Sequence, residues 1–267
     1  MNIFLIGKSL NDKNSFRAKV YDSLQNKKDI NIYLPEHIFV DELFNRDKDL
    51  LSLENILADS VHAIVMCVES AGSIAELGAF ANHEILKDKL IVFIDKKYLK
   101  DKSFIRMGPI KFLHLKSSSK IVWHDFDHFS NEDRNALVNN LKEVSNPDSL
   151  NTSISNPIVA ERFLLALFYV FGNYSRKRII YLLKFIQEKY NIFINLENVI
   201  SIVSSSLSML LKRSEINGSN TNYQLTDKGL YKLDKDLSSQ FIHSHLDKLR
   251  LRMLSSSLRK YWNRRSS

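Results

Sequence analysis

Short apolar runs alternate with amphipathic segments along the first half of the chain. Two runs, at residues 63–68 and 90–94, are continuously apolar, as expected of strands buried on both faces of a sheet. Further strands are predicted at residues 2–6, 30–34 and 121–123. Helices are predicted between them, at residues 14–25, 50–58 and 73–87. This alternation favours an α/β fold with a doubly wound, Rossmann/flavodoxin-like parallel sheet.

The second half of the chain has a mostly helical pattern. Asn156 followed by Pro157 marks a helix start, and Gly172 ends the helix predicted at 158–171. Further helices are predicted at 175–189, where Ser175 is the cap, and at 196–212. A short strand-like piece, a Gly/Asn/Ser turn and a second strand then follow, and the tail from residue 239 is again helical in period. Three helices followed by a β-hairpin predict a winged helix-turn-helix domain.

Amino-acid composition also divides the chain between these two patterns. Residues 146–156 are polar and read as a linker between a domain at 1–145 and a domain at 157–267. Residues 151–267 contain 18 Lys and Arg against 8 Asp and Glu, net +10, whereas residues 1–150 contain 20 and 22, net −2. This asymmetry indicates a polyanionic partner for the second domain, although a solvated basic surface has the same composition.

Basic residues cluster at predicted helix ends and in the tail. The candidates for nucleic-acid contacts are Arg176, Lys177, Arg178, Lys212, Arg213, Arg250 and Arg252. The third predicted helix of this domain is rich in serine and offers few side chains that read bases in bidentate fashion. We therefore expect recognition of shape and backbone rather than of base sequence.

Several classes of protein are excluded or disfavoured. No run of eighteen apolar residues is present, and the N-terminus lacks the basic region of a signal peptide, so no membrane association is expected. A single cysteine excludes a disulfide framework and fits a reducing cytoplasm, with Cys67 as a buried small hydrophobic residue. The segment WHDFDHF at 123–129 matches no zinc spacing, so no metal site is expected.

The segment ESAGSIAELGAF at residues 69–80 lies where a buried strand meets a helix. Gly72 permits a tight turn, and Ser73 can cap the helix with Glu76 at capping-box spacing. Glu76 then either completes this cap or serves as a catalytic carboxylate. In the second case the helix dipole keeps its carboxylate ionised, facing the pocket at the end of the sheet. There it would attack or stabilise an anomeric carbon with oxocarbenium character.

The turn after the first strand is a weaker candidate. Gly7, Lys8 and Ser9 do not form a dinucleotide-binding or Walker pattern. Their backbone could approach a sugar or phosphate, or form an ordinary loop between a strand and a helix.

Residues 50–80, LLSLENILADSVHAIVMCVESAGSIAELGAF, resemble the core of nucleoside deoxyribosyltransferase-like proteins. They are most similar to the effectors of type II-A bacterial retrons, which are anti-phage systems. The resemblance continues through GPI at 108–110, AERFLL at 160–165, YQLT at 223–226 and LDKLRL at 246–251. It covers nearly the whole chain. Ala71 replaces the family's usual proline, and the chain begins almost at its first strand, without a leading extension.

The resemblance implies an N-glycosidase fused to a winged helix, with Glu76 as catalytic nucleophile. It implies that Glu69 and Ser70 contact the ligand, and it places Glu54 and Asn55 at the family's L-E-N position, where they could also be ordinary helix-surface residues. The full set of candidate substrate-binding residues is Gly7, Lys8, Ser9, Glu54, Asn55, Glu69, Ser70, Gly72 and Ser73.

The resemblance also implies a setting. Such effectors are toxins held in a larger complex with a reverse transcriptase and a branched RNA–DNA hybrid, msDNA, and are implicated in NAD depletion. NAD is therefore expected as a nucleotide substrate, with no cofactor, and the chain is expected to be oligomeric within that complex. Two alternatives remain. One is a nucleotide-sensing, DNA-binding regulator without catalysis, and the other is a deoxyribosyltransferase or hydrolase acting on nucleosides or nucleotides.

Overall fold

A computed structural model describes most of the chain. The described residues are 1–27, 29–35, 58, 61–145, 154, 156–192, 195–219, 221–237 and 240–265. The chain divides into two compact units, Met1–Asn151 and Thr152–Ser267, so the boundary falls within the predicted linker. The helix predicted at 50–58, including Glu54 and Asn55, lies outside the described residues except for Ala58.

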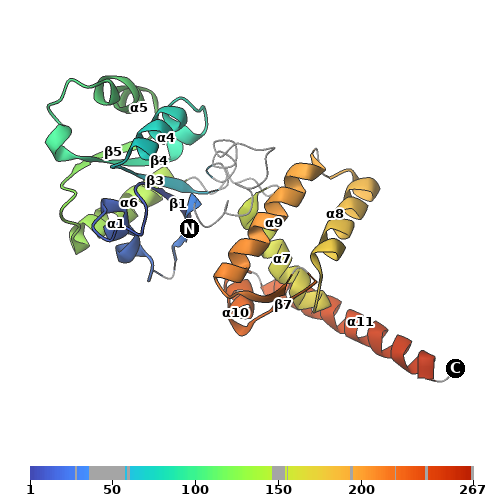
Figure 1. The fold of residues 1–267 in the computed structure, drawn as a ribbon. Coiled ribbons are helices and arrows are strands. Elements are labelled where there is room, and N and C mark those ends of the chain that lie inside the picture. Colours follow the sequence, from blue (N-terminus) through green and yellow to red (C-terminus); the bar gives the residue numbers. More distant parts are fainter. Residues whose placement is uncertain are drawn as a thin grey trace. The chain divides into compact units, whose positions relative to one another are not determined.

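The first unit is built on a five-stranded parallel sheet (Figure 1). Its strands are β1 (Asn2–Ile6), β2 (Asn31–Tyr33), β3 (Ala63–Val68), β4 (Leu90–Asp95) and β5 (Lys120–His124). Their order is β2-β1-β3-β4-β5. This is the flavodoxin-like order, in which the direction of winding reverses between β1 and β3, and ligands bind at such switch points. The predicted α/β class and all five predicted strands are confirmed.

Helices cover both faces of the sheet (Figure 1). α1 (Phe16–Leu24) and α6 (Asn131–Val144) lie on one face, and α4 (Ala71–Ala81) and α5 (Lys111–Lys116) lie on the other. Because side chains alternate along a strand, Val65 and Cys67 pack with α1 and α6, whereas Val68 faces the α4 side. Short helical turns connect the remaining elements, at Leu86–Lys89, Lys96–Tyr98 and Arg106–Ile110.

The sequence pattern did not predict α6, although its start carries a clear signal. The Ser130 hydroxyl accepts a hydrogen bond from the Asp133 N–H at 3.2 Å, and the Asp133 carboxylate accepts one from the Ser130 N–H at 2.7 Å. This is a capping box. Leu137, Leu141 and Val144 then bury one face of the helix against the sheet.

The second unit has the predicted order of elements. It contains α7 (Pro157–Phe171), α8 (Arg176–Tyr190), α9 (Leu196–Lys212), the antiparallel hairpin of β6 (Ile216–Ser219) and β7 (Asn222–Leu225), α10 (Asp227–Asp236) and α11 (Gln240–Arg265). The Asn156 side chain caps α7, and Gly172 ends it with φ of 74°. Only α10 was not predicted. None of the helices traced in the described residues has the length and apolarity needed to cross a membrane.

Candidate active site

The start of α4 differs from the prediction. Ser70, not Ser73, is the N-cap residue, and the helix begins at Ala71 and ends at Ala81 rather than near residue 87. The Ser70 hydroxyl accepts from the Ser73 N–H at 3.2 Å, and the Ser73 hydroxyl accepts from the Ser70 N–H at 3.0 Å. Two serines therefore complete the capping box, and Glu76 is not part of it.

Glu76 is the sixth residue of α4 and lies in its second turn. The expected first-turn position is therefore wrong, and the helix dipole acts on this carboxylate more weakly than predicted, because its effect falls off beyond the first turn. Glu76 is half-buried. Two residues along a helix correspond to about 200° of rotation, so Glu76 and Ile74 lie on opposite flanks of α4. Ile74 faces β4 and β5, which leaves Glu76 on the flank toward β1.

Gly72 does not make the predicted tight turn. It is the second residue of α4, and a Cβ there would meet only the Ser70 hydroxyl, at 3.9 Å.

Gly7 is the more constrained glycine. It has a φ of +155°, and a Cβ there would lie 3.0 Å from both Cβ and the carbonyl oxygen of Cys67. A larger residue at position 7 would therefore separate the ends of β1 and β3 at the switch point.

Glu69 joins the segments that meet at this switch point. Its carboxylate accepts hydrogen bonds from the N–H groups of Phe16 at 2.8 Å, Arg17 at 3.0 Å and Lys8 at 3.4 Å. The Phe16 and Arg17 groups belong to the first turn of α1, where a carboxylate is favoured. Glu69 thus fixes the start of α1 and the loop after β1 to the end of β3, a structural role that the sequence did not indicate.

Two other predicted contacts lie in the same loop and are exposed. The Lys8 ammonium is 2.6 Å from the Asp12 carboxylate, and this hydrogen-bonded pair raises the pKa of Lys8. The Ser9 hydroxyl accepts a hydrogen bond from the Asn11 N–H at 3.3 Å. The buried Arg17 guanidinium holds this loop to the end of β1 by donating hydrogen bonds to the carbonyl oxygens of Leu5 and Lys8.

A cavity of about 420 Å³ lies on the other flank of α4, at the carboxyl ends of β3, β4 and β5. Of the predicted site residues that the structure describes, Glu69 and Ser70 line it, and Glu76 does not. The other lining residues were not predicted from sequence, and they include Tyr98, Asp101, Arg106 and Trp123. No local motif marked these residues, because the stretch at 94–110 and strand β5 meet the end of β3 only in the folded protein.

Cys67 and His124 carry reactive side chains but lie in packed, apolar surroundings. Cys67 is fully buried, as predicted, and burial raises the pKa of its thiol. The ring of His124 packs among Phe16, Phe93 and Phe129. Within the described ranges, no three His, Cys, Asp or Glu side chains gather as a metal site would require.

The chain matches known proteins over most of its length. The model of the STM3845 retron effector protein family matches residues 13–217. This chain belongs to that family of retron effectors. It is 32% identical to the retron Ec86 ribosyltransferase/DNA-binding protein of Escherichia coli, over 100% of this chain and 87% of that protein. It is also 39% identical to the retron Ec73 ribosyltransferase/DNA-binding protein of Escherichia coli, over 27% of each chain.

In the second unit of this retron effector, the start of α8 is strongly basic. Arg176, Lys177 and Arg178 are exposed, and the Arg176 guanidinium donates to the Ser204 hydroxyl of α9 at 3.0 Å. Arg252 is exposed on α11, and the Arg250 guanidinium stacks over the Tyr169 ring, 4.5 Å from its centroid. Each of these cations is placed where an external anion can approach it.

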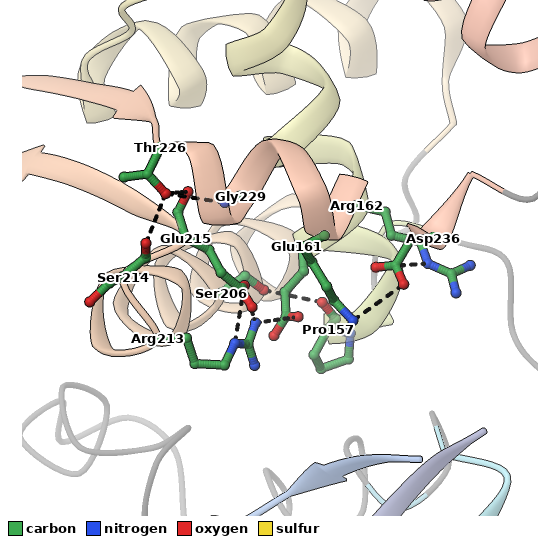
Figure 2. A network of polar contacts seen from close by, with 11 residues as sticks. Pro157, Glu161, Arg162, Ser206, Arg213, Ser214, Glu215, Thr226, Gly229 and Asp236 are labelled. Atoms are coloured by element: carbon green, nitrogen blue, oxygen red, sulfur yellow. Dashed lines mark hydrogen bonds and ion pairs between the residues drawn. The ribbon is translucent and has the colours of Figure 1, made fainter. Parts of the chain in front are cut away.

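Arg213 and Lys212 have different surroundings, although they are adjacent in sequence. Lys212 is exposed. The Arg213 guanidinium lies 2.7 Å from Glu161 and 3.0 Å from Glu215, two buried carboxylates, as Figure 2 shows. Arg213 therefore belongs to an internal ion-pair network, and its expected role as a nucleic-acid contact is corrected.

Proposed function

We propose that this retron effector cleaves the N-glycosidic bond between nicotinamide and ribose in NAD, with Glu76 as the catalytic carboxylate. The proposal is supported by the helical phase of α4. Ile74 lines the cavity over β4 and β5, so Glu76, about 200° further round the helix, is expected on the flank toward β1 and the switch point of the sheet. Ligands of doubly wound folds bind there. Two relatives named ribosyltransferase/DNA-binding protein support glycosyl transfer as the reaction class.

In this reaction the bond between C1′ and the nicotinamide nitrogen breaks, and its electron pair stays with nicotinamide, which becomes neutral. The anomeric carbon then carries oxocarbenium character, and the Glu76 carboxylate bonds to it or stabilises it. Water completes the reaction, giving ADP-ribose and releasing one proton. Glu69 holds the surrounding loops in place through its three hydrogen bonds with backbone N–H groups.

The direct test is to incubate purified effector with NAD and to measure nicotinamide and ADP-ribose, with and without a reverse transcriptase and branched RNA–DNA hybrid. We expect the two products in equal amounts. Release of bases from nucleosides instead would support the nucleoside hydrolase or transferase alternative. Binding of NAD without turnover under every condition would support the sensing alternative.

The second unit supports a second function, the binding of nucleic acid through its backbone. Its three helices and hairpin have the element order of a winged helix. Tyr174 also exchanges two hydrogen bonds with Tyr223 of β7, at 2.8 and 3.0 Å, which form an isolated antiparallel β-bridge beside the hairpin. The exposed cations at the start of α8 add to the positive end of that helix, which attracts phosphate.

We predict that changing Arg176, Lys177 and Arg178 together to glutamate strongly weakens binding to a branched RNA–DNA hybrid. The log–log slope of affinity against salt should fall by roughly 0.7–0.9 for each phosphate that the variant no longer neutralises. Fluorescence anisotropy over a range of salt concentrations measures both quantities. The control is glutamate at Lys100, Lys102 and Lys116, three exposed lysines of the first unit. Equal weakening in both variants would indicate a net-charge effect and contradict the assignment to α8.

We also predict that this α8 variant separates toxicity from the partner complex. A polyanion bound to the second unit can control the first only if it binds active and inactive arrangements with different free energies. The assay is host growth with wild-type or variant effector, each with and without reverse transcriptase and its hybrid. Wild-type toxicity should depend on the partners, whereas that of the variant should not. Unchanged toxicity in all four combinations would exclude the basic surface as the regulator.

A further inference from the structure

The cavity of about 420 Å³ is separate from the flank of α4 that carries Glu76. It opens at the carboxyl ends of β3, β4 and β5, whereas Glu76 lies toward β1. The N-terminus of α4 lies between the two places, because Ser70 and Ala71 line the cavity while Glu76 follows on the opposite flank. The volume of the cavity is in the range of sites that bind small molecules.

The lining of the cavity combines two kinds of surface. Ile74, Ile94, Ile110 and the indole of Trp123 form apolar walls that suit the flat face of a heterocyclic base. Asp101 and Arg106 contribute opposite charges, and the Arg106 guanidinium donates to the Asp101 carbonyl at 3.3 Å. A carboxylate is a good acceptor for the hydroxyl groups of a ribose, and a guanidinium pairs well with phosphate. A base, a ribose and a phosphate together make a nucleotide.

We propose that this cavity binds the adenosine 5′-phosphate half of a dinucleotide, whose other half extends past the N-terminus of α4 to Glu76. A helix N-terminus favours the negative charge of a bridging pyrophosphate. The assignment of the second half to Glu76 rests on the function proposed above, whereas nucleotide binding in the cavity does not. A nucleoside substrate would need only the Glu76 side, so the cavity favours a dinucleotide over a nucleoside.

The test uses Trp123 as a reporter in the full-length protein. The chain contains two tryptophans, Trp123 and Trp262, so Trp262→Phe leaves the one that lines the cavity. Adding Glu76→Gln to this variant slows any cleavage of a nicotinamide ligand during the titration. Adenosine 5′-monophosphate and ADP-ribose should change the Trp123 fluorescence in a saturable way. Nicotinamide mononucleotide, whose base is smaller than adenine and covers less of the apolar walls, should change it only at higher concentrations.

Arg106→Gln then tests the orientation of the nucleotide. It should weaken binding of adenosine 5′-monophosphate about tenfold, because a hydrogen bond to a charged group is removed, and should leave adenosine binding almost unchanged. Lys111→Gln is the matched control, since Lys111 is an exposed cation nearby that does not line the cavity. Equal weakening of both ligands by Arg106→Gln, in protein of unchanged thermal stability, would overturn the phosphate assignment.

Two outcomes separate this proposal from the proposed function. Hydrolysis of NAD by the wild-type protein, with no effect of any adenine nucleotide on Trp123, would overturn the cavity assignment and leave the glycosidase intact. Saturable, Arg106-dependent binding of adenosine 5′-monophosphate, with no hydrolysis of NAD under any condition, would support the cavity as a nucleotide site and overturn the role of Glu76.

Discussion

Glu76→Gln is expected to lower the rate of nicotinamide release by ~10²–10⁴, the usual effect of removing a positioned catalytic group. Glutamine keeps the size and hydrogen-bonding reach of glutamate but lacks the charge that opposes the developing oxocarbenium ion. The fold should be unaffected, because Ser70 and Ser73, not Glu76, cap α4, and because glutamine and glutamate have similar helix propensities. The measurement is nicotinamide release by purified proteins at equal concentration.

Glu84→Gln provides the matched control. Glu84 is an exposed glutamate shortly after the end of α4, so the same chemical change is made nearby without altering the flank of Glu76. The control should release nicotinamide at the wild-type rate, and both variants should unfold at the wild-type temperature. Full activity or full cellular toxicity of Glu76→Gln would refute the catalytic assignment.

The predictions from sequence succeeded where one local signal decides the outcome. The apolar run of β3 is long enough, and sufficiently uninterrupted, to identify a strand buried on both faces. Asn156 and Gly172 likewise mark the ends of α7 unambiguously. The start of α4 was misplaced because Ser70 and Ser73 are both good capping residues. The choice between them depends on where β3 ends, which is a tertiary property.

The remaining failures also involve contacts between residues distant in sequence. Glu69 accepts hydrogen bonds from α1, more than fifty residues earlier, so no local pattern could show that it anchors that helix. Arg213 pairs with Glu161, 52 positions away, whereas its neighbour Lys212 is exposed. Charge composition could identify a basic domain. It could not distinguish a cation that neutralises buried carboxylates from one that lies exposed on the surface.

Arg213→Met should destabilise the second unit by about 3–5 kcal/mol at neutral pH, the cost of leaving buried charges without their partner. Glu161 and Glu215 are 3% and 5% exposed. Among the described residues, Glu161 Oε1 has no hydrogen-bond partner, so Arg213 is the main compensation for this carboxylate (Figure 2). Chemical denaturation of the full chain, followed by circular dichroism, measures the free energy of unfolding. Arg162→Met is the control, since its guanidinium is more exposed and lies 3.9 Å from Asp236.

The destabilisation should also depend on pH, in a direction set by Glu161. Burial raises the pKa of Glu161 above its ordinary value, and Arg213 lowers it again. Without Arg213 the pKa of Glu161 in the folded protein rises further. A carboxyl group whose pKa is raised by folding binds its proton more tightly in the folded state. This proton binding stabilises the folded protein fully at pH values below the pKa of the group in the unfolded chain. The stabilisation is lost as the pH rises through the pKa of the group in the folded protein. Arg213→Met should therefore be most destabilised at neutral pH and should recover as the pH falls toward 4.5, the ordinary pKa of a glutamate.

A second substitution identifies the carboxylate responsible. Adding Glu161→Gln to Arg213→Met removes the buried charge and should restore part of the missing stability at pH 7, while making the difference from wild type less dependent on pH. An equal deficit at pH 5 and pH 7 in Arg213→Met, or no recovery in the double variant, would contradict the role given to Glu161. Under non-denaturing conditions, folded Arg213→Met should bind the branched hybrid with the wild-type salt slope, because this guanidinium neutralises carboxylates and not phosphates.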